Sequence, residues 1–133
     1  LSVEAVERVA TTYLGGYTPT TRTFQRQSPS VTPHFDKSVT RHTHQTHCII
    51  GARAYDIHAE RRLPLSLLIN ILGGPSANSR LNVVLREKNG LSYNTEATYT
   101  PYNDSGMVAI YFSSDHHNAD HCRELIDKCA GDA

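Results

Sequence analysis

The stretch GGPSANSRLNVVLREKNGLSYN, residues Gly73–Asn94, decides how the chain around it folds. It opens with two glycines and a proline, which together end a preceding helix. Apolar residues then recur at helical spacing, as at Leu81 and Leu85. The pair Asn89 and Gly90 favours a left-handed exit from that helix, and a strand-like run starts directly after it. The stretch therefore predicts a helix, a tight reversal and a strand in immediate succession.

Two polar side chains, Arg86 and Tyr93, flank the predicted reversal. Arg86 lies near the C-terminus of the helix, where a cation suits the helix dipole, and the reversal could bring Tyr93 close to it. A guanidinium fork beside a phenol can hold a peptide backbone and donate a hydrogen bond to a carbonyl that becomes an oxyanion. The same spacing also fits a helix-end salt bridge beside a half-buried tyrosine. The spacing alone leaves both interpretations open.

Other short runs accompany this stretch in a fixed order. They are HQTHCIIG at 44–51, LLINILGG at 67–74, SRL at 79–81, LREKNGLSY at 85–93 and DSG at 104–106. This ordered set resembles the non-zinc domain of the pitrilysin/insulinase family of zinc metallopeptidases, the inverzincins. The resemblance covers roughly Ser2 to Cys129, and its centre is the run from Leu85 to Tyr93.

The resemblance implies a role for Arg86 and Tyr93. In that family the arginine and the tyrosine of this run reach into a catalytic chamber and contact the peptide substrate opposite the zinc. The zinc belongs to another domain or subunit, so the expected partners are a zinc-bearing domain or subunit and a peptide. The expected activity is that of a zinc metalloendopeptidase, with this chain inactive by itself. The same fold also serves as a non-catalytic structural subunit in complexes related to mitochondrial processing peptidases and respiratory core proteins, and that alternative stays open.

Composition and charge bound the other possibilities. The 133 residues include 38% hydrophobic ones, enough for a single domain with a real core. Thirteen basic residues balance thirteen acidic ones, so no global field favours nucleic acid or an anionic membrane. No apolar run has spanning length and no leader pattern is present, while the cellular compartment stays open. Because the chain starts at Leu1 without methionine, we expect residues 1–133 to be a fragment of the longer non-zinc domain.

The half of the chain before the deciding stretch divides at its glycines and prolines. Its predicted elements are a helix over 3–14 capped by Ser2 and stopped by Gly15-Gly16, a connector over 17–44, a buried central strand over 46–55 and a buried helix over 63–72. Pro19, Pro29 and Pro33 exclude a continuous helix from the connector, which could include an edge strand near Val39. Because so long a connector is unusual inside a compact domain, we expect part of it to lie across another domain.

The second half continues with helices and an antiparallel hairpin. Its predicted elements are a helix over 79–88, strands over 91–100 and 107–113 joined by turn residues at 101–106, and a last helix that follows a cap at Asn118. Alternation places Tyr93 on the same strand face as Thr95 and Ala97. The element order predicts an α+β fold, a two-layer sandwich with a mainly antiparallel sheet and helices packed on one face.

Histidine and cysteine patterns were weighed as metal sites. His42, His44 and His47 lack the further ligands that a tetrahedral zinc site needs, and no H-x-x-E-H sequence occurs. His116, His117 and His121 surround a helix start with Asp115 and Asp120, where Asp120 and His121 could at best form part of a surface site. We therefore predict that this chain binds no zinc, and we interpret Cys48, Cys122 and Cys129 as small core residues rather than a disulfide framework.

Overall fold

The computed structural model describes residues 2–18, 20–21, 23–25, 27, 29–30 and 33–131; the predicted helix breaker Pro19 lies outside them. In chain order the elements are α1 (Val3–Leu14), β1 (Thr46–Ala54), α2 (Arg62–Gly73), the π-helix η1 (Asn82–Lys88), β2 (Ser92–Pro101), β3 (Gly106–Ser114), the 3₁₀-helix η2 (His116–Asn118) and α3 (Ala119–Gly131). The three strands form an antiparallel sheet with helices against it, which confirms the predicted α+β fold.

The sheet has the strand order β1-β3-β2, so β3 lies in the centre and β1 at an edge. The prediction that 46–55 is the central strand is wrong, because β3 takes hydrogen bonds on both of its sides. The predicted hairpin is confirmed: β2 and β3 pair antiparallel through the turn that follows Pro101. Ile49 of β1 is exposed because it lies on the sheet face opposite the core, against which its neighbours Cys48 and Ile50 pack.

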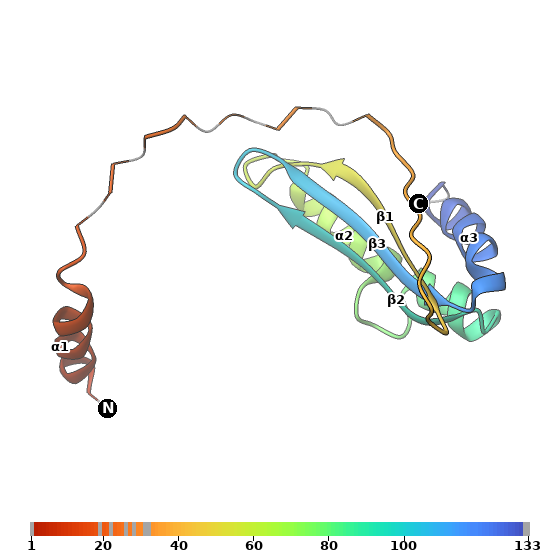
Figure 1. Ribbon diagram of the computed structural model, residues 1–133, viewed down its shortest axis with the longest axis horizontal. Helices are drawn as coiled ribbons and strands as arrows, with labels where there is room; N and C mark the ends of the chain where they lie inside the picture. Colours follow the sequence, from red (N-terminus) through yellow and green to blue (C-terminus); the bar gives the residue numbers. More distant parts are fainter. Residues whose placement is uncertain are drawn as a thin grey trace.

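One face of the sheet carries the hydrophobic core. The buried residues that form it are Ile69, Leu72, Leu81, Leu85, Ala97, Ile110, Phe112, Cys122, Ile126 and Cys129. They come from α2, η1, β2, β3 and α3, with Leu81 directly before η1, so the helices meet the same face of the sheet. Figure 1 shows α2 behind the strands and α3 beside the end of the sheet. The three cysteines are free thiols, and Cys122 and Cys129 lie inside the core as predicted.

Helix α2 is held against β2 at its last turn. A Cβ added at Gly73 would lie 2.6 Å from the Cβ of Ala97, so only glycine permits this close approach. The opposite face of the helix, with Leu63, Leu67 and Ile71, is exposed. The predicted helix is thus confirmed in position, but it is half buried rather than buried.

Helix α1 stands apart from the sheet (Figure 1). Helix α1 begins at its predicted cap, where Ser2 Oγ accepts a hydrogen bond from the Ala5 amide at 3.3 Å, and it has no buried residue. The connector has no strand near Val39, because no β-ladder partner lies opposite that segment. Within the described ranges, no helix combines the length and the apolar character needed to cross a membrane.

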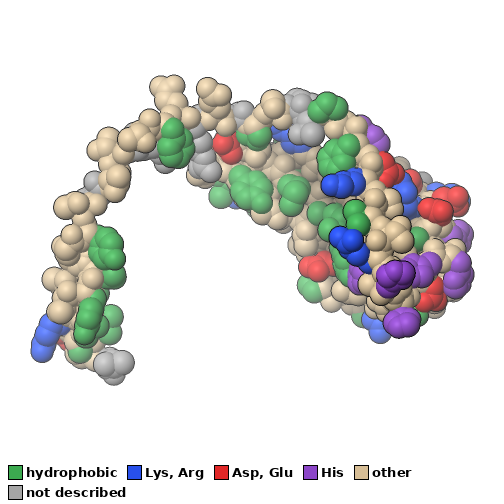
Figure 2. All heavy atoms as spheres, in the orientation of Figure 1, with side chains coloured by type: hydrophobic (Ala, Val, Ile, Leu, Met, Phe, Trp, Pro, Cys, Tyr) green, Lys and Arg blue, Asp and Glu red, His purple; other side chains and the backbone are tan. Residues whose placement is uncertain are grey.

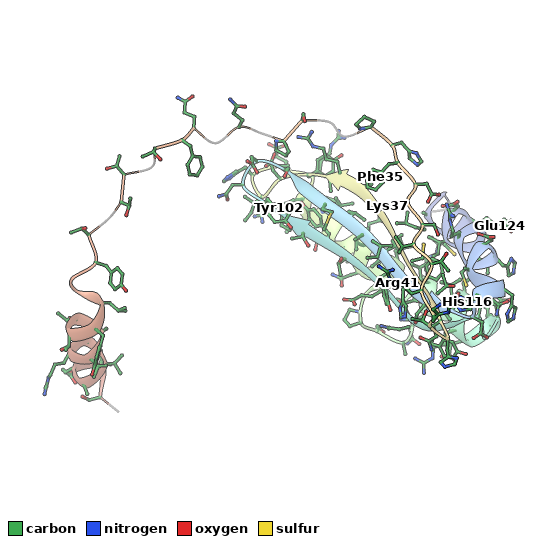
Figure 3. All side chains as sticks on the ribbon, viewed as in Figure 1. Phe35, Lys37, Arg41, Tyr102, His116 and Glu124 are labelled. Carbon is green, nitrogen blue, oxygen red and sulfur yellow. The ribbon has the colours of Figure 1, made fainter. Side chains whose placement is uncertain are left out.

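The last part of the connector contacts β1 and α3 through polar side chains. Arg53 Nη1 donates to the Pro29 carbonyl at 3.2 Å, and Arg123 Nη2 lies 3.3 Å from Asp36 Oδ2. Figure 3 shows Phe35, Lys37 and Arg41 along this segment where it passes the sheet. The connector therefore reaches the body at one end of β1 and follows it toward α3.

Candidate functional site

The helix that carries Arg86 begins where predicted, but its winding differs. The Val83 amide donates to the Ser79 carbonyl at 2.9 Å, and residues 82–88 then form a π-helix instead of the expected α-helix. Leu85 is fully buried and anchors this segment in the core. A π-helical segment is uncommon and occurs frequently at functional sites. Arg86, on the other side of the same turn, has a side chain that is 63% exposed.

The reversal after this helix is closed by backbone hydrogen bonds. The Leu91 amide donates to the Leu85 carbonyl at 2.8 Å, and the Gly90 amide donates to the Arg86 carbonyl at 2.9 Å. Gly90 has a φ of 61°, a conformation that a side chain at this position would make unfavourable. The predicted left-handed exit is thereby confirmed, and it ties the start of β2 directly to the last turn of η1.

Tyr93 occupies a β-bulge at the start of β2. Ser92 pairs with Ser114 and Asn94 pairs with Ser113, so Tyr93 is the additional residue between two consecutive pairs. The simple alternation predicted for this strand is therefore wrong at Tyr93, which is 58% exposed while Thr95 is buried. A bulge of this kind redirects a side chain, and bulges are frequent beside active sites.

Buried hydroxyl groups hold the bulge in place. Ser92 Oγ lies 2.9 Å from the Asn94 carbonyl and 3.0 Å from the Ser113 carbonyl, which share its one proton. Thr95 Oγ1 lies 2.8 Å away and can donate its own proton to Ser92. The sequence analysis missed these residues. A feature of the sequence that could have indicated them is the presence of two hydroxyl residues, Ser92 and Thr95, on either side of Tyr93 in a strand whose neighbouring residues are buried.

The Tyr93 hydroxyl is bonded to an acidic residue far along the chain. It donates to Asp115 Oδ1 at 3.0 Å, and Asp115 follows the last residue of β3. This hydrogen bond, together with the negative charge of Asp115, raises the pKa of Tyr93 above its ordinary value. Tyr93 is therefore a neutral hydrogen-bond donor at neutral pH.

Arg86 and Tyr93 thus lie on either side of the Gly90 turn and both are exposed. The Arg86 Nε lies 3.8 Å from the Glu87 carboxylate, a separation longer than a strong hydrogen bond. The proton of Tyr93 goes to Asp115 and not to a group on η1. The guanidinium of Arg86, carried by η1, and the neutral phenol of Tyr93, carried by β2, are therefore both exposed beside the Gly90 turn.

The two hollows found beside α2 lie elsewhere. The larger, about 550 Å³, is lined by Ala52, Arg53, Ala54, Tyr55, Leu65, Ile69 and Val108, and the smaller, about 210 Å³, lies between α2 and β2. Neither is lined by Arg86 or Tyr93. Both side chains of the candidate site are instead exposed on the surface, Arg86 at 63% and Tyr93 at 58%.

Histidines gather at the end of the body where the connector meets β1 (Figure 2). His116 Nε2 donates to the Thr43 carbonyl at 2.9 Å, and because that carbonyl can only accept, Nδ1 accepts from Thr46 Oγ1 at 2.6 Å. His47 Nδ1 lies 2.8 Å from the Tyr111 hydroxyl. Across the described part of the chain, no three or more His, Cys, Asp or Glu side chains are arranged to hold a metal ion.

The last helix, α3, begins at Ala119, directly after Asn118, which is where it was predicted to start. The 3₁₀ turn η2 precedes α3, and Asp115 takes the capping position. Of the predicted surface pair, His121 Nδ1 lies 3.7 Å from Glu124 Oε2 in the next turn of α3, which is a local ion-pair geometry.

Comparison with known proteins identifies a family and several relatives of this chain. The sequence model of the family described as Peptidase M16 inactive domain matches residues 1–131. An uncharacterized zinc protease of Bacillus subtilis is 39% identical over 71 residues, which are 53% of this chain and 17% of that protein. An uncharacterized zinc protease of Streptomyces coelicolor is 33% identical over 94 residues, 68% of this chain and 20% of that protein.

A solved structure shares the fold. The peptidase M16 inactive domain of Pseudomonas fluorescens superposes with a TM-score of 0.65 at 24% identity, over 68% of this chain and 22% of that one. The chain spans about a fifth of the length of the two zinc proteases, at 17% and 20%. Because the family match extends over nearly every residue, the resemblance centred on Leu85 to Tyr93 is confirmed, and this chain belongs to the Peptidase M16 inactive domain family.

Proposed function

We propose that this domain positions the substrate of a zinc-dependent metalloendopeptidase and closes with a zinc-bearing domain or subunit around a peptide. The observation that carries the proposal is the presentation of two exposed side chains, Arg86 and Tyr93, on either side of the Gly90 turn. Membership in a peptidase family and the zinc proteases among the relatives support it.

The two side chains have complementary roles in this proposal. The Arg86 guanidinium offers paired N–H donors that hold a peptide backbone carbonyl, a geometry that an ammonium cannot reproduce. Tyr93, kept neutral by its raised pKa, donates to the carbonyl oxygen as that oxygen gains negative charge. Both side chains are borne on backbone fixed by buried residues, Leu85 beneath Arg86 and Ser92 beside Tyr93. Backbone fixed in this way presents both donors with little movement of the chain, and only the Tyr93 hydroxyl has to turn from Asp115 to the developing oxyanion.

The zinc of the assembled peptidase would be held by the partner, where it supplies the activation of water. The described residues of this chain provide no ligand set for it. The role of the chain is then confined to binding and orienting the peptide and to covering the site. The exposure of Arg86 and Tyr93 on the surface agrees with a half-site that a second domain completes.

A non-catalytic structural subunit is the second candidate. The observation that favours it is the commitment of the Tyr93 proton to Asp115, which leaves the phenol hydroxyl without a free proton to donate in the unliganded domain. An H-x-x-E-H sequence in the same gene, or in the gene of a partner subunit, would favour the peptidase. Absence of that sequence from every partner would favour the structural subunit.

The deciding experiment replaces Tyr93 and Arg86 in the assembled peptidase. Tyr93→Phe keeps the ring and removes one donor, so we expect kcat to fall by roughly 10²-fold, as for other oxyanion donors. Arg86→Lys should also lower kcat, and the double variant should lose less than the product of the single losses if the two act together. Tyr102→Phe, in the turn between β2 and β3, is the matched control and should keep full activity.

Two further measurements guard this test. Zinc content and far-UV circular dichroism must match the wild type in every variant. Full activity of Tyr93→Phe under those conditions would remove the proposed role. The isolated chain, carefully dialysed, should contain no stoichiometric zinc and should not hydrolyse unstructured peptides. Chelator-sensitive turnover by the pure chain would contradict the proposal that the partner holds the zinc.

A further inference from the structure

We propose that Asp115 is a positioning residue for Tyr93: its carboxylate holds the phenol hydroxyl at the bulge and yields it to the substrate oxygen during the reaction. The proposal rests on the proposed function, and it adds a residue that the sequence analysis assigned only to a helix start. It is carried by the hydrogen bond from Tyr93 to Asp115 Oδ1 at 3.0 Å, which joins the start of β2 to the end of β3.

The Asp115 side chain does not cap the helix that it precedes. Asp115 stands at the capping position of η2 with extended backbone angles, φ −64° and ψ 152°, where an aspartate ordinarily accepts from the first amides of a helix. Its side chain makes no such capping bond. The carboxylate is directed to Tyr93 instead, so the usual structural reason for an aspartate at this place does not account for it.

The Asp115 backbone is held independently of its carboxylate. The Asp115 carbonyl accepts from the Asn118 amide at 3.0 Å and from Ser114 Oγ at 3.1 Å. Ser114, which precedes it, is fully buried at the end of β3. A carboxylate mounted on such a fixed backbone can hold the hydroxyl of an exposed side chain in one place, here that of Tyr93 on its bulge.

The phenol of Tyr93 has a single proton, so it can donate to only one acceptor at a time. While Tyr93 donates to Asp115, its oxygen can offer only lone pairs to an approaching peptide. A hydrogen bond to a half-buried carboxylate such as Asp115 is worth on the order of 10-fold in an equilibrium, whereas an oxyanion donor is worth about 10² to 10³ in rate. The developing oxyanion can therefore take the proton donor from Asp115, and the carboxylate orients the hydroxyl without trapping it.

The contact is tested first in the chain itself. With ¹³C-labelled tyrosine, and with Tyr93→Phe to assign the resonance, the titration midpoint of Tyr93 is measured by NMR. We expect the midpoint to lie above the ordinary tyrosine value in the wild type and to fall in Asp115→Asn and Asp115→Ala. Asp120→Asn, a second acidic side chain near the start of α3, is the matched control and should leave the midpoint unchanged. An unchanged midpoint in Asp115→Ala would overturn the proposal.

The role is then tested in the assembled peptidase. Asp115→Ala should lower kcat/KM by roughly 10-fold, the value of one charge-assisted hydrogen bond, and Asp115→Asn, whose amide oxygen still accepts, should recover most of that loss. In the Tyr93→Phe background, Asp115→Ala should have no further effect. An equal loss in that background, or no rescue by asparagine, would overturn the positioning role.

The outcomes separate the two proposals. If Tyr93→Phe is impaired while Asp115→Ala has wild-type kinetics, the role of Asp115 is overturned and the proposed function stands. If Tyr93→Phe is fully active, both are overturned, whatever the NMR titration shows of the contact.

Discussion

Replacement of Gly73 by alanine should separate α2 from β2 and destabilise the domain. The added Cβ would lie 2.6 Å from the Ala97 Cβ, 2.8 Å from the Ala97 amide nitrogen and 3.2 Å from Leu81 Cδ1. Carbon atoms pack at about 3.5 to 4.0 Å, so the helix end would have to move back by roughly 1 Å. Ala97 is buried in the middle of β2 and its backbone cannot move aside without disturbing the β2–β3 ladder.

The expected magnitude follows from two opposing effects. Inserting a methyl group into a packed core costs about 1 to 3 kcal/mol. Alanine in place of glycine gains at most about 0.5 to 1 kcal/mol from lower chain entropy in a helix, and less at a helix end. The free energy of unfolding should therefore fall by about 1 to 2 kcal/mol in Gly73→Ala.

Urea unfolding followed by far-UV circular dichroism measures this difference. Gly131→Ala is the matched control, since an added Cβ at the end of α3 meets no atom within 4 Å, and it should change stability by less than about 0.5 kcal/mol. Ala97→Gly in the Gly73→Ala background should cost less than it does alone, because it removes the nearest clashing atom. Wild-type stability of Gly73→Ala would refute the packing argument.

Other perturbations test the bulge and the ionisable groups. Ser92→Ala leaves the Thr95 hydroxyl without its acceptor and two carbonyls without their donor, so the free energy of unfolding should fall by about 1 to 3 kcal/mol; an unchanged urea midpoint would contradict this. The pKa of Tyr93 is raised in the folded chain, so the hydrogen bond to Asp115 stabilises the fold below a pH of about 10 and loses this effect as the phenol ionises at higher pH. The Tm difference between wild type and Asp115→Asn should therefore become smaller above that pH. A Tm difference that becomes larger above that pH would contradict this reasoning. Burial raises the pKa of the Cys122 thiol, so mass spectrometry should find it unmodified by iodoacetamide at pH 8 until urea unfolds the chain, and fast alkylation of native protein would refute its burial.

Local chemistry determined much of the fold in advance. Helix α1 begins and ends where Ser2 and Gly15 predict, and α2 ends at its glycine pair. Gly90 takes the left-handed conformation expected of it, and the hairpin forms between its two alternating runs. These features depend on residues within a few positions of one another, because caps, breakers and periodicity act through bonds that span one or two turns.

Tertiary structure decided the rest, and it decided the candidate site. The edge position of β1 depends on which strand β3 meets on each side, which no local pattern encodes. The bulge that exposes Tyr93 arises from a register shift against Ser113 and Ser114, some twenty residues away, and the half-exposure of α2 depends on how much of the sheet face is available. Asp115 meets Tyr93 only because β2 and β3 are paired. Sequence could propose Arg86 and Tyr93 from their family run, but the partners of a side chain across a sheet follow from pairing and register, which are properties of the folded chain.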